Sequence, residues 1–85
     1  MDAIMVCRQR CSMRRLGELC QALSEIEGVT IRVSKKNGHY VNGKSLMGML
    51  ALGISPDDVL HIEVSGDNEV VATNRAATLI SEALN

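Results

Sequence analysis

Two serines stand directly before apolar segments of helical character, and both hydroxyl groups are candidates for chemistry. Ser12 precedes a segment that begins at Met13, and Ser45 precedes the apolar run 46–52. A serine in this place caps a helix by accepting a hydrogen bond from a backbone N–H group, which is worth ~1 kcal/mol. A phosphate on Ser45 would face the positive end of its helix, where an anion is tolerated. The pattern therefore predicts two capped helices.

Four arginines gather around the first of these caps: Arg8, Arg10, Arg14 and Arg15. Arg14 and Arg15 fall in the first turn of the expected helix, where cations are mildly unfavourable against the helix dipole. The plain interpretation is a solvated basic loop. The alternative is that Arg14 and Arg15, beside Ser12 and the helix N–H groups, hold a phosphate or a carboxylate of a partner protein.

The composition excludes several classes of function. Nine basic residues oppose ten acidic ones, and the chain has one tyrosine but no tryptophan or phenylalanine. Nucleic-acid binding favours a clustered basic excess with aromatic side chains for stacking, so we expect no nucleic-acid partner. No apolar run reaches the ~18 residues of a membrane span. Arg8 and Arg10 interrupt any signal peptide, so we expect a cytoplasmic protein without membrane contact.

The three cysteines and two histidines suggest no metal centre. Cys7 and Cys11 are four residues apart, which falls within zinc-ligand spacing, but two further ligands are needed. Cys20 belongs to an apolar helical stripe, and His39 and His61 lie elsewhere as ordinary surface residues. An odd number of cysteines does not indicate a disulfide framework. We expect no metal and no cofactor, and we interpret Cys11 as an incidental thiol.

The hydrophobic periodicity predicts seven elements. Apolar residues recur every three or four positions over 13–26, with Gly28 as a stop, and they alternate over 29–33 and 60–64. Asn37-Gly38 is a hairpin turn signal. The last helix is expected to bury Val70, Ala77, Ile80 and Leu84. The expected strands are 3–7, 29–33, 40–42 and 60–64, and the expected helices are 13–26, 45–52 and 70–84.

This order, β-α-β-β-α-β-α, indicates an α+β fold. Strands with one apolar face form a mostly antiparallel sheet that must be covered on one side by helices. We therefore expect an open-faced sandwich, with a four-stranded antiparallel sheet, three helices on one face, and Arg32, His61 and Glu63 on the other. Eighty-five residues form one domain, 1–85.

The element order and the segment 41–54 resemble HPr, the histidine-containing phosphocarrier of the bacterial sugar phosphotransferase system. The stretch Lys-Ser-Leu-Met-Gly, followed by Leu-Gly-Ile, is similar to the regulatory serine segment of that family. The family's second signature is an H-x-R-P motif at the start of the first helix. Aligning the leucine stripe places Ser12 at the histidine position, with Met13, Arg14 and Arg15 after it. A slip of one residue would place Cys11 there.

The missing histidine has a chemical consequence. A phosphocarrier must both accept and surrender a phosphoryl group, and imidazole suits this role near neutral pH. An unassisted serine hydroxyl is a poor nucleophile, and its phosphate is a stable ester. We therefore expect that the carrier role is lost at Ser12. The alternative is a working phosphocarrier that uses an atypical acceptor such as Cys11.

The resemblance implies a regulatory role for Ser45, since the equivalent serine is the target of a kinase in many Gram-positive relatives. Leu46, Met47 and Leu50 match the family's apolar docking patch, and the arginine that matches Arg14 contacts phosphate and protein partners. The expected function is that of an HPr-like regulatory or adaptor protein that is not an enzyme. Its expected partners are proteins: an HPr-type serine kinase, phosphotransferase-system enzymes or a transcriptional regulator.

Overall fold

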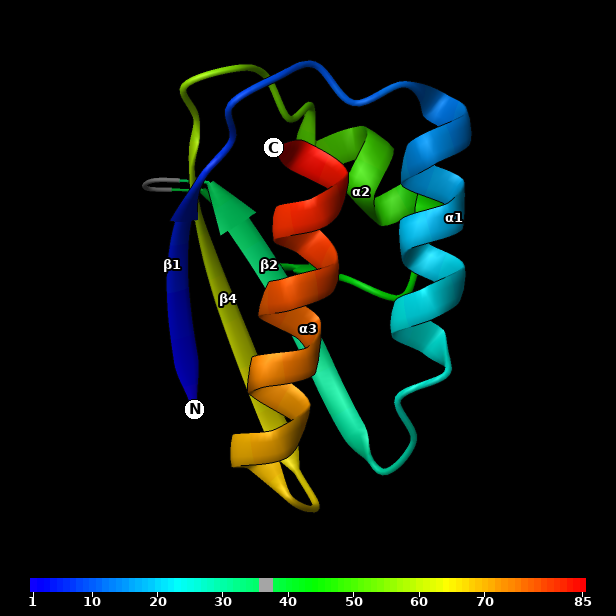
Figure 1. Cartoon of the computed structure of the whole chain (residues 1–85), viewed down its shortest axis with the longest axis vertical. Coiled ribbons are helices and arrows are strands. Elements are labelled where there is room, and N and C mark those ends of the chain that lie inside the picture. Colours follow the sequence, from blue (N-terminus) through cyan, green and yellow to red (C-terminus); the bar gives the residue numbers. More distant parts are fainter. Residues whose placement is uncertain (36–37) are drawn as a thin grey trace.

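The computed structural model describes residues 1–35 and 38–85, and it has the expected order of elements (Figure 1). The elements are β1 (Asp2–Val6), α1 (Met13–Ser24), β2 (Val29–Lys35), β3 (Val41–Asn42), α2 (Leu46–Leu52), β4 (Val59–Gly66) and α3 (Glu69–Leu84). The strands form one antiparallel sheet in the order β1-β4-β2-β3. All three helices lie on the same face of this sheet (Figure 1). The open-faced α+β sandwich expected from the sequence is therefore confirmed.

Alternation along the strands separates the two faces of the sheet. The inward side chains of the central strands are fully or almost fully buried: Val29, Ile31, Val33, Leu60, Ile62 and Val64. On the open face, Arg32 Nη1 lies 2.9 Å from Glu63 Oε1, and the Arg32 guanidinium carbon lies 4.8 Å from the centre of the Tyr40 ring. This face is polar in its centre, as the alternation predicts.

Several element boundaries differ from the sequence-based expectation. β4 runs from Val59 to Gly66, beyond the expected 60–64, because Gly66 still pairs with Val29. Gly66 has a φ of 131°, and a Cβ atom there would collide with the carbonyl oxygen of Gly28. The strand therefore ends at this glycine, and the turn into α3 follows at residues 67–68. The hairpin turn expected at Asn37-Gly38 lies partly outside the described residues, because these do not include Asn37.

Helix α1 buries the predicted stripe. Leu16, Leu19, Cys20 and Leu23 are buried against the sheet and the other helices. The helix ends at Ser24 and not at 26, and the Glu25 and Ile26 N–H groups donate to Ala22 and Leu23 as the last turn tightens. Gly28 follows with a φ of 79°, a conformation that favours glycine.

The buried face of α3 was predicted wrongly at two positions. Val70 is 55% exposed and Ala77 is only half-buried, whereas Ile80 and Leu84 are buried as expected. Each residue of a helix is rotated by about 100° around the helix axis from the one before it, so residues four apart lie nearly on one line along the helix. Val70 is rotated by about 80° from Ile80 around this axis and therefore lies on a different face. The observed stripe follows this spacing and contains Ala72, Thr73, Ala76, Ile80 and Leu84.

Candidate functional site

The start of α1 carries the position at which the sequence predicts the site. Ser12 is exposed and extended (φ −67°, ψ 159°), and its Oγ accepts a hydrogen bond from the Arg15 backbone N–H at 3.1 Å. The Ser12 carbonyl accepts the first bond of the helix, from the Leu16 N–H at 2.9 Å. Ser12 is therefore the N-cap of α1, as expected, with its hydroxyl oxygen facing the helix N–H groups.

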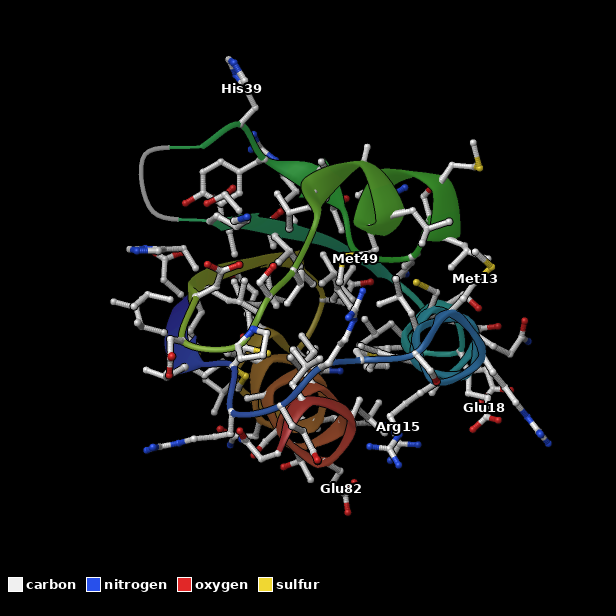
Figure 2. All side chains as sticks on the ribbon, turned by 90° about the horizontal axis from the view of Figure 1, so that it is seen from above. Met13, Arg15, Glu18, His39, Met49 and Glu82 are labelled. Carbon is white, nitrogen blue, oxygen red and sulfur yellow. The ribbon has the colours of Figure 1, made fainter. Side chains whose placement is uncertain are left out.

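Neither histidine lies at this helix start. His39 lies in the connection between β2 and β3 and points away from the helices into solvent (Figure 2). His61 is on β4 opposite Ile4 and Ser34, on the face of the sheet that carries no helix. Its neighbours Leu60 and Ile62 are the residues that face the helices. A carrier imidazole is therefore not supplied to Ser12 from another part of the fold.

The arginines around Ser12 point in different directions. Arg14 Nε lies 3.5 Å from Glu18 Oε1, in an exposed ion pair along α1. Arg15 leaves α1 on the side of α3, where it lines a shallow groove together with Glu18 and Glu82 (Figure 2). Arg10 instead lines the hollow between the 8–12 loop and α2. Arg14 and Arg15 therefore both lie beside Glu18, and Arg10 is the arginine of this group that lines the hollow beside α2.

Cys11 lies at the wall of that hollow, which has a volume of about 160 Å³. Its other lining residues are mainly apolar: Leu16, Met49, Leu50 and Ile54. Burial raises the pKa of the Cys11 thiol, although the positive charge of Arg15 opposes this shift. Since the thiolate is the nucleophilic form, the surroundings weaken Cys11 as a nucleophile near neutral pH.

The second predicted position, Ser45, is also a helix cap. Its Oγ accepts from the Gly48 N–H at 3.2 Å, and its carbonyl accepts from the Met49 N–H at 3.0 Å. The preceding Lys44 is anchored, because its Nζ donates to the carbonyls of Ile26 at 2.7 Å and Val29 at 2.8 Å. Lys44 thus ties the start of α2 to the connection between α1 and β2, next to Ser45.

Helix α2 divides its apolar side chains between the core and solvent. Met49 is fully buried, Leu46 is half-buried, Leu50 is 38% exposed and Met47 is 76% exposed. Of the three residues predicted to form a docking patch, Met47 and Leu50 are therefore the accessible ones. Leu46 instead faces α1, where its Cδ2 would be 4.0 Å from a Cβ atom placed on Gly17.

Sequence reasoning missed Met13 as a member of this surface. Met13 is 66% exposed and leaves α1 on the side of α2 (Figure 2). It stands about one helical turn before Leu16 and Gly17, the α1 residues that adjoin Leu50 and Leu46. We define the α1–α2 patch as Met13, Met47 and Leu50. The signal for Met13 was an apolar residue in the first, exposed turn of an otherwise amphipathic helix.

An ionic contact holds the loop that supports the site. Asp58 Oδ2 accepts from the Ser55 N–H at 2.7 Å and lies 3.2 Å from Lys35 Nζ, which also donates to the Gly53 carbonyl at 2.9 Å. The Cys7 N–H donates to the Asp58 carbonyl at 2.9 Å, so this loop also holds the start of the 8–12 segment. The backbone bond from Ser55 and, after it, the Lys35 ammonium lower the pKa of Asp58 from its ordinary value of 3.8.

We expect this contact to make stability depend on pH in the acid range. Folding favours the Asp58 carboxylate, so its stabilisation is complete well above pH 3.8 and is lost as the pH falls through the lower pKa of the folded state. Urea unfolding should show the wild type to be more stable than Asp58→Asn at neutral pH, with the difference closing below about pH 3.8. A difference that stays constant down to pH 2 would contradict the assigned role of the Asp58 charge.

Comparisons with known proteins agree with the fold. Residues 5–82 match the family described as the PTS HPr component phosphorylation site, where PTS denotes the phosphotransferase system. The chain is 29% identical over 72 residues to the phosphocarrier protein HPr of Xylella fastidiosa, which corresponds to 85% of this chain and 79% of that protein.

Solved structures show the same architecture. The structure of HPr-C-His from Thermoanaerobacter tengcongensis superimposes with a TM-score of 0.83 and 27% identity, covering 99% of this chain and 94% of that one. Crh, the Bacillus subtilis catabolite repression containing protein, gives a TM-score of 0.73 over 92% of this chain and 87% of that one. At 22% identity, the likeness to Crh concerns the fold alone.

The fold and the matched region define a small open-faced sandwich of the phosphotransferase-system type. The chain belongs to the HPr family of phosphocarrier proteins. Within residues 1–35 and 38–85, no helix is both long and apolar enough to cross a membrane.

Proposed function

We propose that this member of the HPr family acts as a cytoplasmic regulatory or adaptor protein and no longer carries a phosphohistidine. The observation that carries the proposal is the hydroxyl of Ser12 at the start of α1, with both histidines placed elsewhere. A serine at this point caps the helix but offers no labile P–N bond and no imidazole nucleophile. The protein then works through binding and is not an enzyme, with the whole chain acting as one domain.

Ser45 is the proposed control point. A phosphate on its hydroxyl adds about −1.5 to −2 charges at neutral pH. The charge would lie at the start of α2, two residues before Met47. Helix α2 carries two of the three residues of the α1–α2 patch. The nearest lysine, Lys44, already binds two carbonyl oxygens and is part-buried, so it does not lie free to neutralise the new charge. Phosphorylation would therefore change the surface that a partner meets.

The proposed partners are proteins that dock on the α1–α2 patch and on the cations beside it. Candidates are an HPr-type serine kinase, enzymes of the phosphotransferase system and a transcriptional regulator. Arg10 and Arg14 lie on either side of Ser12 in the sequence and are exposed, so both are available for acidic groups of a partner. Leu46 contributes by fixing α2 against α1 and not by direct contact.

We expect an HPr-type kinase with ATP to phosphorylate Ser45 and no other serine. The product should gain the mass of one phosphate, located at Ser45 by peptide sequencing, and Ser45→Ala should remain unmodified. Ser12→Ala is the matched control, because it removes the other helix-capping hydroxyl and should still accept one phosphate. Phosphate found at Ser12, or none at all, would contradict the proposed regulation.

The alternative is a working phosphocarrier that uses Cys11 as its acceptor. A partly accessible thiol one residue from Ser12 favours this function, whereas the raised pKa of the Cys11 thiol works against it. Incubation with phosphoenolpyruvate and the first enzyme of the phosphotransferase system distinguishes the two. Phosphate acceptance that is abolished by thiol alkylation, and by Cys11→Ser, would establish the alternative.

A further inference from the structure

The two most exposed side chains of the α1–α2 patch are both thioethers. Met47 is 76% exposed and Met13 is 66% exposed, whereas Leu50, the third member, is 38% exposed. The chain has five methionines. Met13 leaves α1 on the side of α2, and Met47 follows Leu46, the α2 residue that lies beside Gly17 of α1. The apolar character of this surface therefore depends largely on two exposed methionine side chains.

An exposed thioether can be oxidised without unfolding the protein. A peroxide donates one oxygen atom to the sulfur lone pair: the S–O bond forms, the O–O bond breaks, and water leaves when the oxidant is hydrogen peroxide. The sulfur loses two electrons and the peroxide is reduced. The product, methionine sulfoxide, is polar, and reductases of the methionine sulfoxide class restore the thioether.

The fold separates the exposed methionines from a protected one on the same helix. Met49 stands two residues after Met47 but is fully buried beneath α2, in the core cluster. Met5 is half-buried on β1, and Met1, which is 48% exposed, directly precedes that strand. Since susceptibility follows exposure, oxidation should select Met13 and Met47 over Met49.

We propose that Met13 and Met47 form an oxidation-sensitive modification site that controls docking on the α1–α2 patch. The consequence for docking rests on the proposed function, because it requires that partners bind this patch. Conversion of both thioethers to sulfoxides places two polar S=O groups where a partner would bury apolar atoms, and burying a polar group without a hydrogen bond is unfavourable. Both side chains project into solvent, so the fold accommodates the added oxygen atoms.

The first experiment tests the site without any partner. The full chain is treated with limiting hydrogen peroxide, and sulfoxide at each methionine is measured by peptide mass spectrometry. Met13 and Met47 should oxidise on the order of tenfold faster than Met49. The oxidised protein should also elute earlier from a phenyl matrix, with an unchanged far-ultraviolet circular dichroism spectrum. Equal oxidation of Met49, or unchanged retention, would overturn the proposal.

Leucine variants assign the change in retention to the two sulfur atoms. In the double variant M13L/M47L, peroxide should shift the retention much less than in the wild type, although Met1 stays exposed. Met5→Leu is the matched control, because it removes a thioether outside the patch and should stay as sensitive as the wild type. A shift in M13L/M47L as large as that of the wild type would contradict the assignment.

The last measurement separates this inference from the proposed function. Phosphorylation of Ser45 by an HPr-type kinase is measured before and after oxidation. The KM of the kinase for the oxidised wild type should rise several-fold. The KM for the M13L/M47L variant should be the same before and after the peroxide treatment. If the kinase does not modify the untreated protein, the proposed function is contradicted. The sulfoxide mapping by mass spectrometry and the elution from the phenyl matrix would still decide whether Met13 and Met47 are the modification site. A KM unchanged by oxidation would overturn the control of docking.

Discussion

Replacement of Ser12 by histidine is expected to turn a protein that accepts no phosphoryl group from phosphoenolpyruvate into one that does. The substitution places an imidazole at the N-cap of α1, next to the Arg15 N–H group that donates to the Ser12 hydroxyl. Imidazole is a good nucleophile near neutral pH, and phosphate bound to its nitrogen is labile, unlike a serine ester. The purified variant is incubated with the first enzyme of the phosphotransferase system and labelled phosphoenolpyruvate, and an acid-labile product is measured.

Position on the helix provides the matched control for this experiment. Ser24→His places the same side chain at the other end of α1, where Ser24 is also exposed, and this variant should accept no phosphate. An acid-labile label on the wild type would show that the carrier role persists. If His39→Gln or His61→Gln then removed the label, the acceptor would be a histidine that the fold places away from Ser12.

The fold could be predicted where the hydrophobic periodicity clearly marks the buried face of an element. In α1, four leucine and cysteine positions spaced by three or four residues lie on one face, and all four are buried. In α3, valine, threonine and alanine occur on several faces of the helix. The sequence therefore predicted that Val70 and Ala77 are buried, whereas the structure buries Ala76. Small and β-branched residues mark the buried face weakly, because the neighbouring sheet and not their own hydrophobicity decides which of them is covered.

The site shows a second limit of sequence reasoning. Ser12 and Ser45 were both identified as helix caps, because capping is local and depends on residues within one turn. The directions of Arg10, Arg14 and Arg15 were not predictable, since they depend on which helix lies beside α1 at each side. Met13 was missed for the same reason. Its exposure beside α2 follows from the packing of two helices that are far apart in the sequence.

Truncation of the two methionines of α2 should change stability by very different amounts. Met49→Ala removes a fully buried side chain from the core and should lower the free energy of unfolding by about 2–5 kcal/mol. Met47→Ala removes a side chain that is 76% exposed and should change stability by no more than about 0.5 kcal/mol. Chemical denaturation followed by circular dichroism measures both values, and equal losses would contradict the orientation of α2.

Met47 and Met49 also allow an effect on docking to be distinguished from an effect on stability. Under conditions in which both variants remain folded, Met47→Ala should raise the KM of the HPr-type kinase for this protein, because the exposed thioether is part of the proposed contact. The maximal rate of Ser45 phosphorylation should stay close to that of the wild type, since the Lys44 anchor and the Ser45 cap do not involve Met47. A cost to stability at Met49 of that size is large for a chain of 85 residues, whose core supplies a margin of only a few kcal/mol. Under the proposed function, the buried Met49 therefore holds α2 in place, and the exposed Met47 contributes to the contact with a partner.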